Sequence, residues 1–304
     1  MFSDTHFHFS YLLENQNFET AKNILCQMAE QNVFFGMDIG TKANDLPVRF
    51  ENFLKVLNLF DEKNADDKKI KTKVENFFYF SAGIWPDYDS IKNRFEKIKI
   101  LEKNISDFRK MKNAFSKKLV AIGEGGLDYH WNKTETSSEN LKNSENKNDF
   151  DLQKAEKELF ELQLEFAKKE NLPFVIHSRD AAEETLDCIK NISYDLGILH
   201  CCSYTLAEVK KFLERGWYIS FSGSVTYAKK NKLDEINSLL AYIPEDRILL
   251  ETDSPYLAPV PMRGKKNNPN FVEYTYNFVA KARNICVEKL CEIVDKNCKE
   301  LFSI

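Results

Sequence analysis

Apolar residues in this chain gather in eight short runs, which alternate with longer segments of mixed character. Nearly continuous apolar runs of this length are typical of strands that are buried on both faces. The runs occupy residues 1–9, 32–40, 76–86, 118–129, 172–180, 196–202, 216–225 and 247–255. Between most of them apolar residues recur at helical spacing, most clearly over residues 18–32, 155–172 and 205–216. Strands that alternate with helices predict a parallel sheet covered by helices.

The number of runs favours a closed sheet. Eight strand–helix units predict an α/β fold of the TIM-like (β/α)8 barrel type. An open, doubly wound sheet is the alternative. We expect a single domain over residues 1–304, because α/β barrels commonly have this length. Apolar residues at helical spacing over residues 287–302 predict a closing helix.

Two polar stretches interrupt the alternation. Residues 61–73 are highly charged and poor in apolar residues, and residues 132–150 are rich in Asn, Ser, Glu and Lys. Both compositions predict solvated loop insertions. The second stretch follows the fourth strand, so it could lie over the face of the barrel where active sites are built.

Composition excludes some classes of protein. The formal net charge is −4 and the pI is about 5.9, which is not the basic footprint of a protein that holds nucleic acid by charge alone. Seven cysteines without framework spacing predict a reducing compartment, and we expect a cytoplasmic protein. We expect no signal peptide and no membrane span, since no apolar run approaches about 18 residues. We also expect no obligate protein partner.

Histidine is the informative residue, because the chain has only five. His6, His8, His177 and His200 lie in the apolar runs, toward their C-terminal ends, whereas His130 lies beyond the end of its run. In a barrel these ends form the rim that carries active sites. His6 and His8 are two positions apart, so in a strand both imidazoles share a face. Each of these histidines alone could equally be a hydrogen-bonded core residue.

Two carboxylates occupy similar positions. Glu124 ends an apolar stretch and is flanked by glycines, and Asp253 follows the last run. A buried carboxylate is costly unless it is paired or bound to a metal. A structural ion pair for Glu124 and a simple turn for Asp253 are the alternatives. Together the side chains suit two divalent cations bridged by a carboxylate, a centre that makes hydroxide available at neutral pH. Asp253 could orient or deprotonate the water. The predicted set is His6, His8, Glu124, His177, His200 and Asp253.

The order of the motifs carries a resemblance. The segments DTHFHF, GEGGLDY, VIHSRDA, LHC, FSGSVTY, ETDSPYLAP and RGKKNNP follow one another from Phe2 to about Pro269. This order closely resembles the TatD family of metal-dependent deoxyribonucleases, within the amidohydrolase superfamily. The resemblance implies a TIM-like barrel with two divalent cations (Zn, Mn or Mg) and 3′-to-5′ exonuclease activity on DNA, either single-stranded or at its ends.

Roles for individual residues also follow from the resemblance. It implies that His6, His8, Glu124 and Asp253 bind the first cation. It implies that Glu124, His177 and His200 bind the second, so that Glu124 bridges the two and is catalytic together with Asp253. The chain departs from the family pattern at Cys202-Ser203-Tyr204 and at Asn267-Asn268-Pro269, which puts substrate preference in doubt. Tyr204 could narrow the substrate mouth.

Phosphate needs positive partners, and the chain offers several near the predicted rim. Arg179 follows His177 by two residues, and Arg263 and Lys265 follow Asp253. Arginine offers a planar fork that fits phosphate. Tyr129, with His130 and Trp131, could stack on a base. The alternatives are an ion pair of Arg179 with Asp180 or Glu183, a solvated loop for Arg263 and Lys265, and packing for the aromatic group.

Three functions compete on this basis. The leading hypothesis is a two-metal hydrolase of DNA phosphodiesters. The second is an amidohydrolase that uses the same centre on a small-molecule amide, ester or lactone, because a fold does not determine a substrate. The third is a protein that binds metal or nucleic acid without catalysis, against which the intact set of candidate ligands argues.

Overall fold

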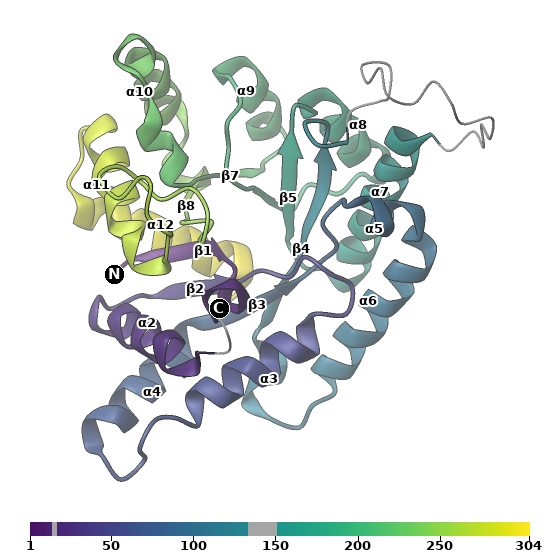
Figure 1. The fold of residues 1–304 in the computed structure, drawn as a ribbon. Helices are drawn as coiled ribbons and strands as arrows, with labels where there is room; N and C mark the ends of the chain where they lie inside the picture. The colour runs from purple at the N-terminus through teal and green to yellow at the C-terminus, as the bar shows by residue number, and fades with distance from the viewer. Residues whose placement is uncertain (14–16, 133–150) are drawn as a thin grey trace.

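The computed structural model describes residues 1–13, 17–132 and 151–304. Its centre is an eight-stranded sheet in which every strand is parallel to the next, in the order of the chain. The strands are β1 (Ser3–Phe7), β2 (Phe35–Asp38), β3 (Phe78–Ala82), β4 (Leu119–Asp128), β5 (Phe174–Arg179), β6 (Gly197–Leu199), β7 (Tyr218–Phe221) and β8 (Ile248–Leu250). Figure 1 shows these strands at the centre with helices around them.

The first and last strands meet and nearly close the ring. A parallel bridge joins Phe7 to Ser254, just beyond the end of β8. The backbone N–H of His8 donates to the Ser254 carbonyl at 2.8 Å, and the N–H of Asp253 donates to the His6 carbonyl at 2.8 Å. The predicted TIM-like barrel is therefore confirmed, and the open sheet is not.

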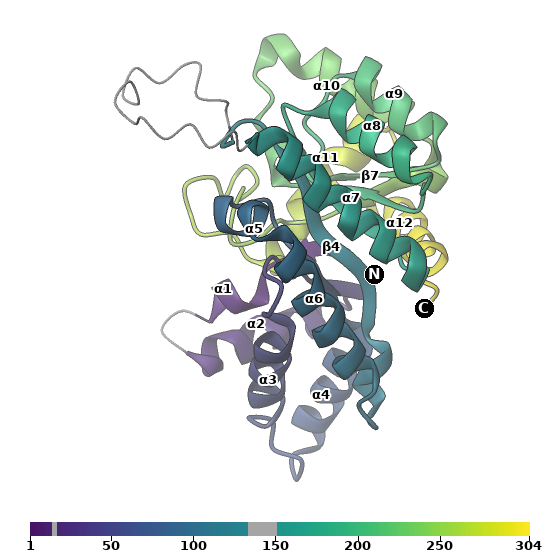
Figure 2. The ribbon, with the colours of Figure 1, turned by 90° about the vertical axis from the view of Figure 1, so that its right-hand side faces the viewer.

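Helices cover the outside of the barrel. They are α1 (Phe9–Leu12), α2 (Phe18–Glu30), α3 (Leu46–Leu57), α4 (Ala65–Phe77), α5 (Tyr88–Lys92), α6 (Arg94–Arg109), α7 (Leu152–Glu170), α8 (Ala182–Ile192), α9 (Leu206–Glu214), α10 (Leu233–Tyr242), α11 (Val272–Ala282) and α12 (Val287–Phe302). Helices α5, α6 and α7 run along one side (Figure 2). The closing helix predicted over residues 287–302 is confirmed as α12, which packs against β1 and β8.

The core is rich in phenylalanine. Phe53 of α3 stacks on Phe78 of β3 with ring centroids 4.2 Å apart, and Phe80 lies 5.7 Å from Phe53. All three side chains are fully buried. Burying an aromatic side chain removes a large apolar area from water, so this layer anchors α3 to the sheet.

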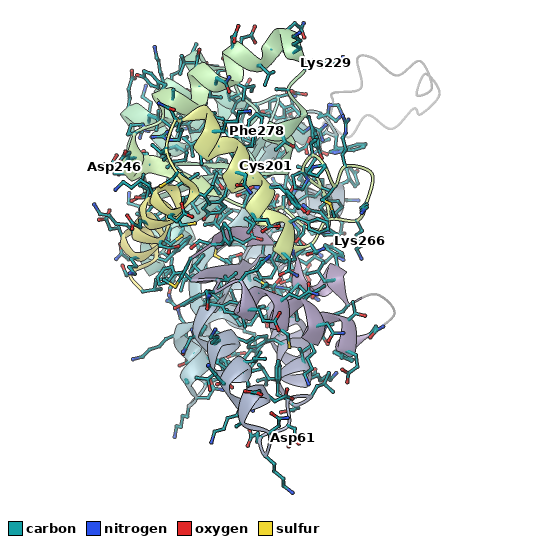
Figure 3. The ribbon with its side chains drawn as sticks, turned by 90° about the vertical axis from the view of Figure 1, so that its left-hand side faces the viewer. Asp61, Cys201, Lys229, Asp246, Lys266 and Phe278 are labelled. Carbon is teal, nitrogen blue, oxygen red and sulfur yellow. The ribbon has the colours of Figure 1, made fainter. Side chains whose placement is uncertain are left out.

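The prediction of a loop insertion over residues 61–73 is wrong. Most of that stretch belongs to α4, which begins after Asn64, whose side chain accepts hydrogen bonds from the N–H groups of Asp66 and Asp67. Only Val74 and Phe77 of α4 are buried, so the charged residues lie on the solvent side of the helix. Asp61 is at one end of the molecule, far from Cys201 at its centre (Figure 3).

The second predicted insertion, 132–150, lies almost entirely outside the described residues. Asn132 is described and buried. Its side-chain amide donates to the Pro86 carbonyl at 2.8 Å and to Glu156 at 3.0 Å. These hydrogen bonds hold the side chain of Asn132, the last described residue before the gap.

Strand β4 carries an irregularity that matters for the site. Its pairing with β5 shifts register between Gly123 and Gly125, on either side of Glu124. Gly123 has a φ of +120°, and a Cβ at this position would lie 2.5 Å from the Val175 carbonyl oxygen. A larger residue would collide with β5 there, so glycine is needed to place Glu124.

Candidate metal centre

The six predicted side chains come together at the mouth of the barrel, although they derive from strand ends far apart in the chain. Glu124 lies in the middle and is almost fully buried. One of its oxygens, Oε2, lies 3.3 Å from His6 Nε2 and 3.8 Å from His8 Nε2. The other, Oε1, lies 3.0 Å from His177 Nδ1 and 3.1 Å from His200 Nε2. The two carboxylate oxygens therefore face two different pairs of imidazoles.

Asp253 completes the first pair. Its Oδ1 lies 3.6 Å from the Nε2 atoms of both His6 and His8. Two groups of candidate ligand atoms are close enough to share a cation, namely His6 with Glu124 and His200, and His6 with His8 and Asp253. Imidazole nitrogens with carboxylate oxygens are donors that suit Zn and Mn, and the carboxylates also admit Mg.

His6 gives the clearest sign that something binds here. Its side chain is fully buried, and neither of its ring nitrogens makes a hydrogen bond within the described part of the chain. A buried polar atom is nearly always satisfied, so an unpartnered imidazole that points at two carboxylates fits a metal ligand.

The protonation of the site supports the same interpretation. Burial alone would raise the pKa of Glu124, but the imidazoles of His200, His177 and His6 hold that pKa well below its usual range. Burial lowers the pKa of His6, next to His200. Burial opposes charge on His200 as well, yet Glu124 and Glu251 raise its pKa well above the usual value. Glu124 thus remains ionised and attracts positive charge, whether from protons or from cations.

Sequence reasoning missed the acids behind the histidines. His177 Nε2 donates to Asp128 Oδ2 at 2.8 Å, which leaves Nδ1 directed at Glu124. His200 Nδ1 donates to Glu251 Oε1 at 3.3 Å, and the N–H of Cys201 donates to the same oxygen at 2.8 Å. Carboxylates in this position determine the tautomer and the ring orientation of a metal-binding histidine. Alternation could have identified Glu251, which precedes Asp253 by two residues.

Two further acids were missed near the first pair of histidines. Asp4 accepts hydrogen bonds from the N–H and the hydroxyl of Thr252, at 2.9 and 2.7 Å, and so ties β1 to the end of β8. Asp38 accepts from the N–H of Phe9 at 2.9 Å and pairs with the buried Arg49 at 2.8 Å. Phe9 follows His8 directly, so the pair of Asp38 with Arg49 fixes the backbone beside this ligand candidate.

A cavity of about 1050 Å³ opens above the six side chains. Arg179 lines it, and its guanidinium carbon lies 6.0 Å from the ring centre of Trp131, which also lines the cavity. Among the described residues Arg179 has no ion-pair partner; Asp180 pairs with His130, and Glu183 pairs with Lys211. The proposed pairing of Arg179 with Asp180 or Glu183 is therefore wrong, and Arg179 faces the cavity.

Three predicted substrate-binding residues are not among those that line this cavity. Tyr129 packs against the hydrophobic core, and its buried hydroxyl has no hydrogen-bond partner within the described residues. Arg263 is exposed, with its guanidinium 4.5 Å from the ring centre of Tyr227. Lys265 is exposed as well. The structure gives none of these three a contact with the cavity, whereas Trp131, from the same predicted aromatic group as Tyr129, lines it.

Tyr204 does not narrow the mouth. Its hydroxyl lies 2.7 Å from the Ser178 hydroxyl and accepts from the N–H of Ala181 at 3.2 Å, while its ring stacks on Phe212. It therefore braces the end of β5 from the helix side.

All seven cysteines are free. The Cys201 sulfur lies 3.1 Å from the Ser222 hydroxyl, and burial raises the pKa of the Cys201 thiol.

Comparison with known proteins agrees with this geometry. A protein of Bacillus subtilis, the uncharacterized metal-dependent hydrolase YabD, is 37% identical over 189 residues, which is 62% of this chain and 66% of the relative. An uncharacterized metal-dependent hydrolase of Buchnera aphidicola subsp. Acyrthosiphon pisum is 29% identical over 304 residues, 99% of this chain and 98% of the relative. A Rahnella protein named 3′-5′ ssDNA/RNA exonuclease TatD is 30% identical over 249 residues, 80% of this chain and 84% of that protein.

Solved structures share the fold. A TatD homologue from Escherichia coli K12, YJJV, superposes with a TM-score of 0.72 at 23% identity, covering 100% of this chain and 98% of the other. No helix in the described residues is long and apolar enough to cross a bilayer. Residues 3–303 match the model of the family described as TatD related DNase. The chain therefore belongs to the TatD family and is a metal-dependent hydrolase.

Proposed function

We propose that this hydrolase cleaves phosphodiester bonds in DNA, from the 3′ end of single-stranded or frayed substrate, with two divalent cations bound at the mouth of the barrel. The proposal rests on the orientation of the Glu124 carboxylate. Its Oε2 faces His6 and His8, while its Oε1 faces His177 and His200. A carboxylate placed in this way suits a bridge between two cations. His6, His8 and Asp253 would complete one site, and His177 and His200 the other.

Divalent cations bound there would supply a hydroxide at neutral pH and would neutralise the charge that develops on the oxygens of a phosphodiester. The protein residues have distinct tasks around them. Asp253 lines the cavity and lies beside both His6 and His8, so we assign it the proton of the attacking water. Asp128 and Glu251 hold His177 and His200 in the orientation in which they face Glu124.

Phosphate recognition falls to Arg179. Its guanidinium lies at the cavity wall and is not engaged by a carboxylate in the described residues, so its planar fork is available for two oxygens of a phosphate. The name of the Rahnella relative, an exonuclease of single-stranded DNA and RNA, supports nucleic acid as the substrate. We also propose a cytoplasmic location, which the seven free cysteines support.

The test is a cleavage assay on metal-stripped protein. Single-stranded DNA with a 5′ label is incubated with added Mn, Mg or Zn, and the products are resolved by length. We expect metal-dependent shortening from the 3′ end, and a loss of about 10²- to 10⁴-fold in turnover for Asp253→Asn, since this change removes the general base. Asp180→Asn is the matched control, because Asp180 is an exposed acid next to Arg179 that pairs with His130 and does not belong to the predicted ligands.

A second comparison separates the nuclease from a small-molecule hydrolase. Arg179→Ala should lower the turnover of DNA far more than that of a neutral ester or lactone, because only the phosphate needs the guanidinium. No metal-dependent cleavage of DNA above the Asp253→Asn background, together with turnover of a neutral ester that is insensitive to Arg179→Ala, would contradict the proposal.

A further inference from the structure

Exposed aromatic rings are concentrated at the cavity. Six aromatic side chains in the described residues are more than 45% exposed, and three of them, Tyr11, Trp131 and Tyr256, line the cavity above the candidate metal centre. Their exposed fractions are 46%, 68% and 52%. Exposed apolar rings that lie together at one site are typical of a surface that binds a ligand or partner through apolar contacts.

Two of these rings form one group, which we call the tyrosine platform (Tyr11 and Tyr256). Their ring centroids are 6.3 Å apart, and they lie 5.6 and 6.1 Å from the ring of His8. Tyr11 belongs to α1, directly after β1, and Tyr256 follows β8. The platform therefore borders the half of the site that contains His8 and Asp253.

The second group, which we call the tryptophan platform, consists of Trp131 and Arg179. The guanidinium of Arg179 lies 6.0 Å from the Trp131 ring centre, within the range of a cation–π contact. Arg179 is two residues beyond His177, and Trp85, which also lines the cavity, packs edge-on to His177 at 5.7 Å. This platform borders the other half of the site.

The two platforms face each other across the mouth. The tyrosine platform follows β8 and β1, whereas the tryptophan platform follows β4 and β5, and these two pairs of strands lie on opposite sides of an eight-stranded ring. Glu124 lies between them and points one oxygen toward the histidines of each half. A phosphate held by cations beside Glu124 would thus have one aromatic platform on either side.

We infer that the site takes a single-stranded nucleic acid with one base on each side of the scissile phosphate, one base stacked on each platform. This inference rests on the proposed function and adds the mode of substrate binding. Stacking uses the faces of a base, which every base has and which a duplex conceals, so it tolerates any sequence. The cavity of about 1050 Å³ is at the upper end of the usual range for small-ligand sites, which leaves room for more than one nucleotide.

The experiment combines variants of each platform with substrates that lack one base. Single-stranded oligonucleotides carry an abasic site either at the 3′-terminal nucleotide or at its 5′ neighbour. Their affinity is measured by fluorescence anisotropy in metal-stripped native protein, which does not cleave them, and their kcat/KM in the metal-loaded native protein. We expect each missing base to weaken binding by about 5- to 150-fold, the effect of losing one stacked base.

The platform variants should each cancel one of these effects. In Trp131→Ala, one of the two abasic sites should cause no further loss of affinity, and in Tyr11→Ala the other should cause none. A base and the ring on which it stacks form a coupled pair, so removing either one removes the same interaction. Trp131→Phe and Tyr11→Phe keep a ring and should restore the sensitivity. Phe95→Ala is the control, since Phe95 is 56% exposed but outside the cavity, and it should remain sensitive to both abasic substrates.

The outcomes separate the two proposals. Cleavage of DNA in which both alanine variants remain sensitive to both abasic substrates overturns the platforms and leaves the nuclease intact. Duplex DNA bound as tightly as single strands overturns them as well. Binding that depends on the platforms without metal-dependent cleavage supports the platforms and contradicts the nuclease.

Discussion

Each candidate ligand of the second pair has a carboxylate on its far side. Asp128 accepts from His177, and Glu251 accepts from His200. The nearest oxygen of Glu124 then faces the remaining nitrogen of each ring. A histidine oriented in this way loses little conformational entropy when it binds a cation, and the carboxylate increases its basicity.

Replacement of Asp128 by Asn should therefore weaken metal binding without changing any proposed ligand. The amide cannot accept a charge-assisted hydrogen bond, so the His177 ring loses its preferred tautomer. We expect metal affinity to fall by about 10- to 100-fold, measured by titration of stripped protein. Asp87→Asn provides the control, because Asp87 lines the same cavity but bonds to Ser90 instead of a histidine. Equal losses in the two variants would argue against a positioning role.

Metal affinity should also depend on pH. Burial opposes charge on His8, His177 and His200, but the neighbouring carboxylates raise all three pKa values above the usual 6.5, so these rings hold protons that a cation must displace. In metal-free protein such protons stabilise the fold below about pH 6.5, and this contribution is lost as pH rises through the raised pKa values. Metal binding should strengthen over the same interval. Metal titrations of stripped protein at pH 6 and pH 8 test this prediction. Tighter metal binding at pH 6 than at pH 8 would contradict it.

Among the elements, α4 shows how capping creates a helix in a polar stretch. Its side chains are largely charged, and only Val74 and Phe77 are buried. Asn64 caps the first turn, and Asp66 and Asp67 place negative charge at the positive end of the helix dipole. With so little buried apolar surface, the cap accounts for a substantial part of the local stability.

Loss of that cap should be measurable. Asn64→Ala leaves the N–H groups of Asp66 and Asp67 without their acceptor, and we expect the free energy of unfolding to fall by about 1 kcal/mol in urea denaturation. Asn64→Asp should retain stability, since Asp caps as well as Asn. Asn113 offers a comparison at a shorter 3-10 turn, where it caps the N–H of Phe115. An unchanged midpoint for Asn64→Ala would mean that α4 is held by packing alone.

At the scale of the whole molecule, the site connects distant parts of the barrel. The six side chains come from β1, β4 and β5 and from the segments that follow β1, β6 and β8. A cation bound by them would therefore link strands that are otherwise joined only through their neighbours around the ring. Its binding energy would add to the stability of the barrel as a unit.

Removal of metal should lower the melting temperature. At a metal concentration 100 times the dissociation constant, binding stabilises the folded state by about 2.7 kcal/mol. For a chain of this size that corresponds to a shift of about 5 °C, measured by calorimetry with metal and with chelator. Glu124→Gln should abolish most of the shift. Glu183→Gln is the control and should keep the shift, because Glu183 is an exposed residue that pairs with Lys211. A shift that survives Glu124→Gln would place the cation elsewhere.

The sequence by itself determined the barrel and the identity of the six converging side chains. Apolar runs specify strands through burial, and the ends of parallel strands must meet at one rim. His6 and His8 follow from alternation at the end of β1. The same spacing of two residues places Asp4 before His6, and Glu251 before Asp253. These are local rules, so they can be applied without coordinates.

Other features depended on the tertiary structure. Only the register shift around Glu124 and the ring of strands decide that each of its oxygens faces a different pair of histidines. Tyr129, directly after β4, packs against the core, while Trp131 reaches the cavity. The many charged residues of α4 led to the prediction of a loop, although this segment is a helix stabilised by a cap and two buried residues. Such outcomes depend on which surfaces meet when the barrel closes, a property that no single segment of the chain contains.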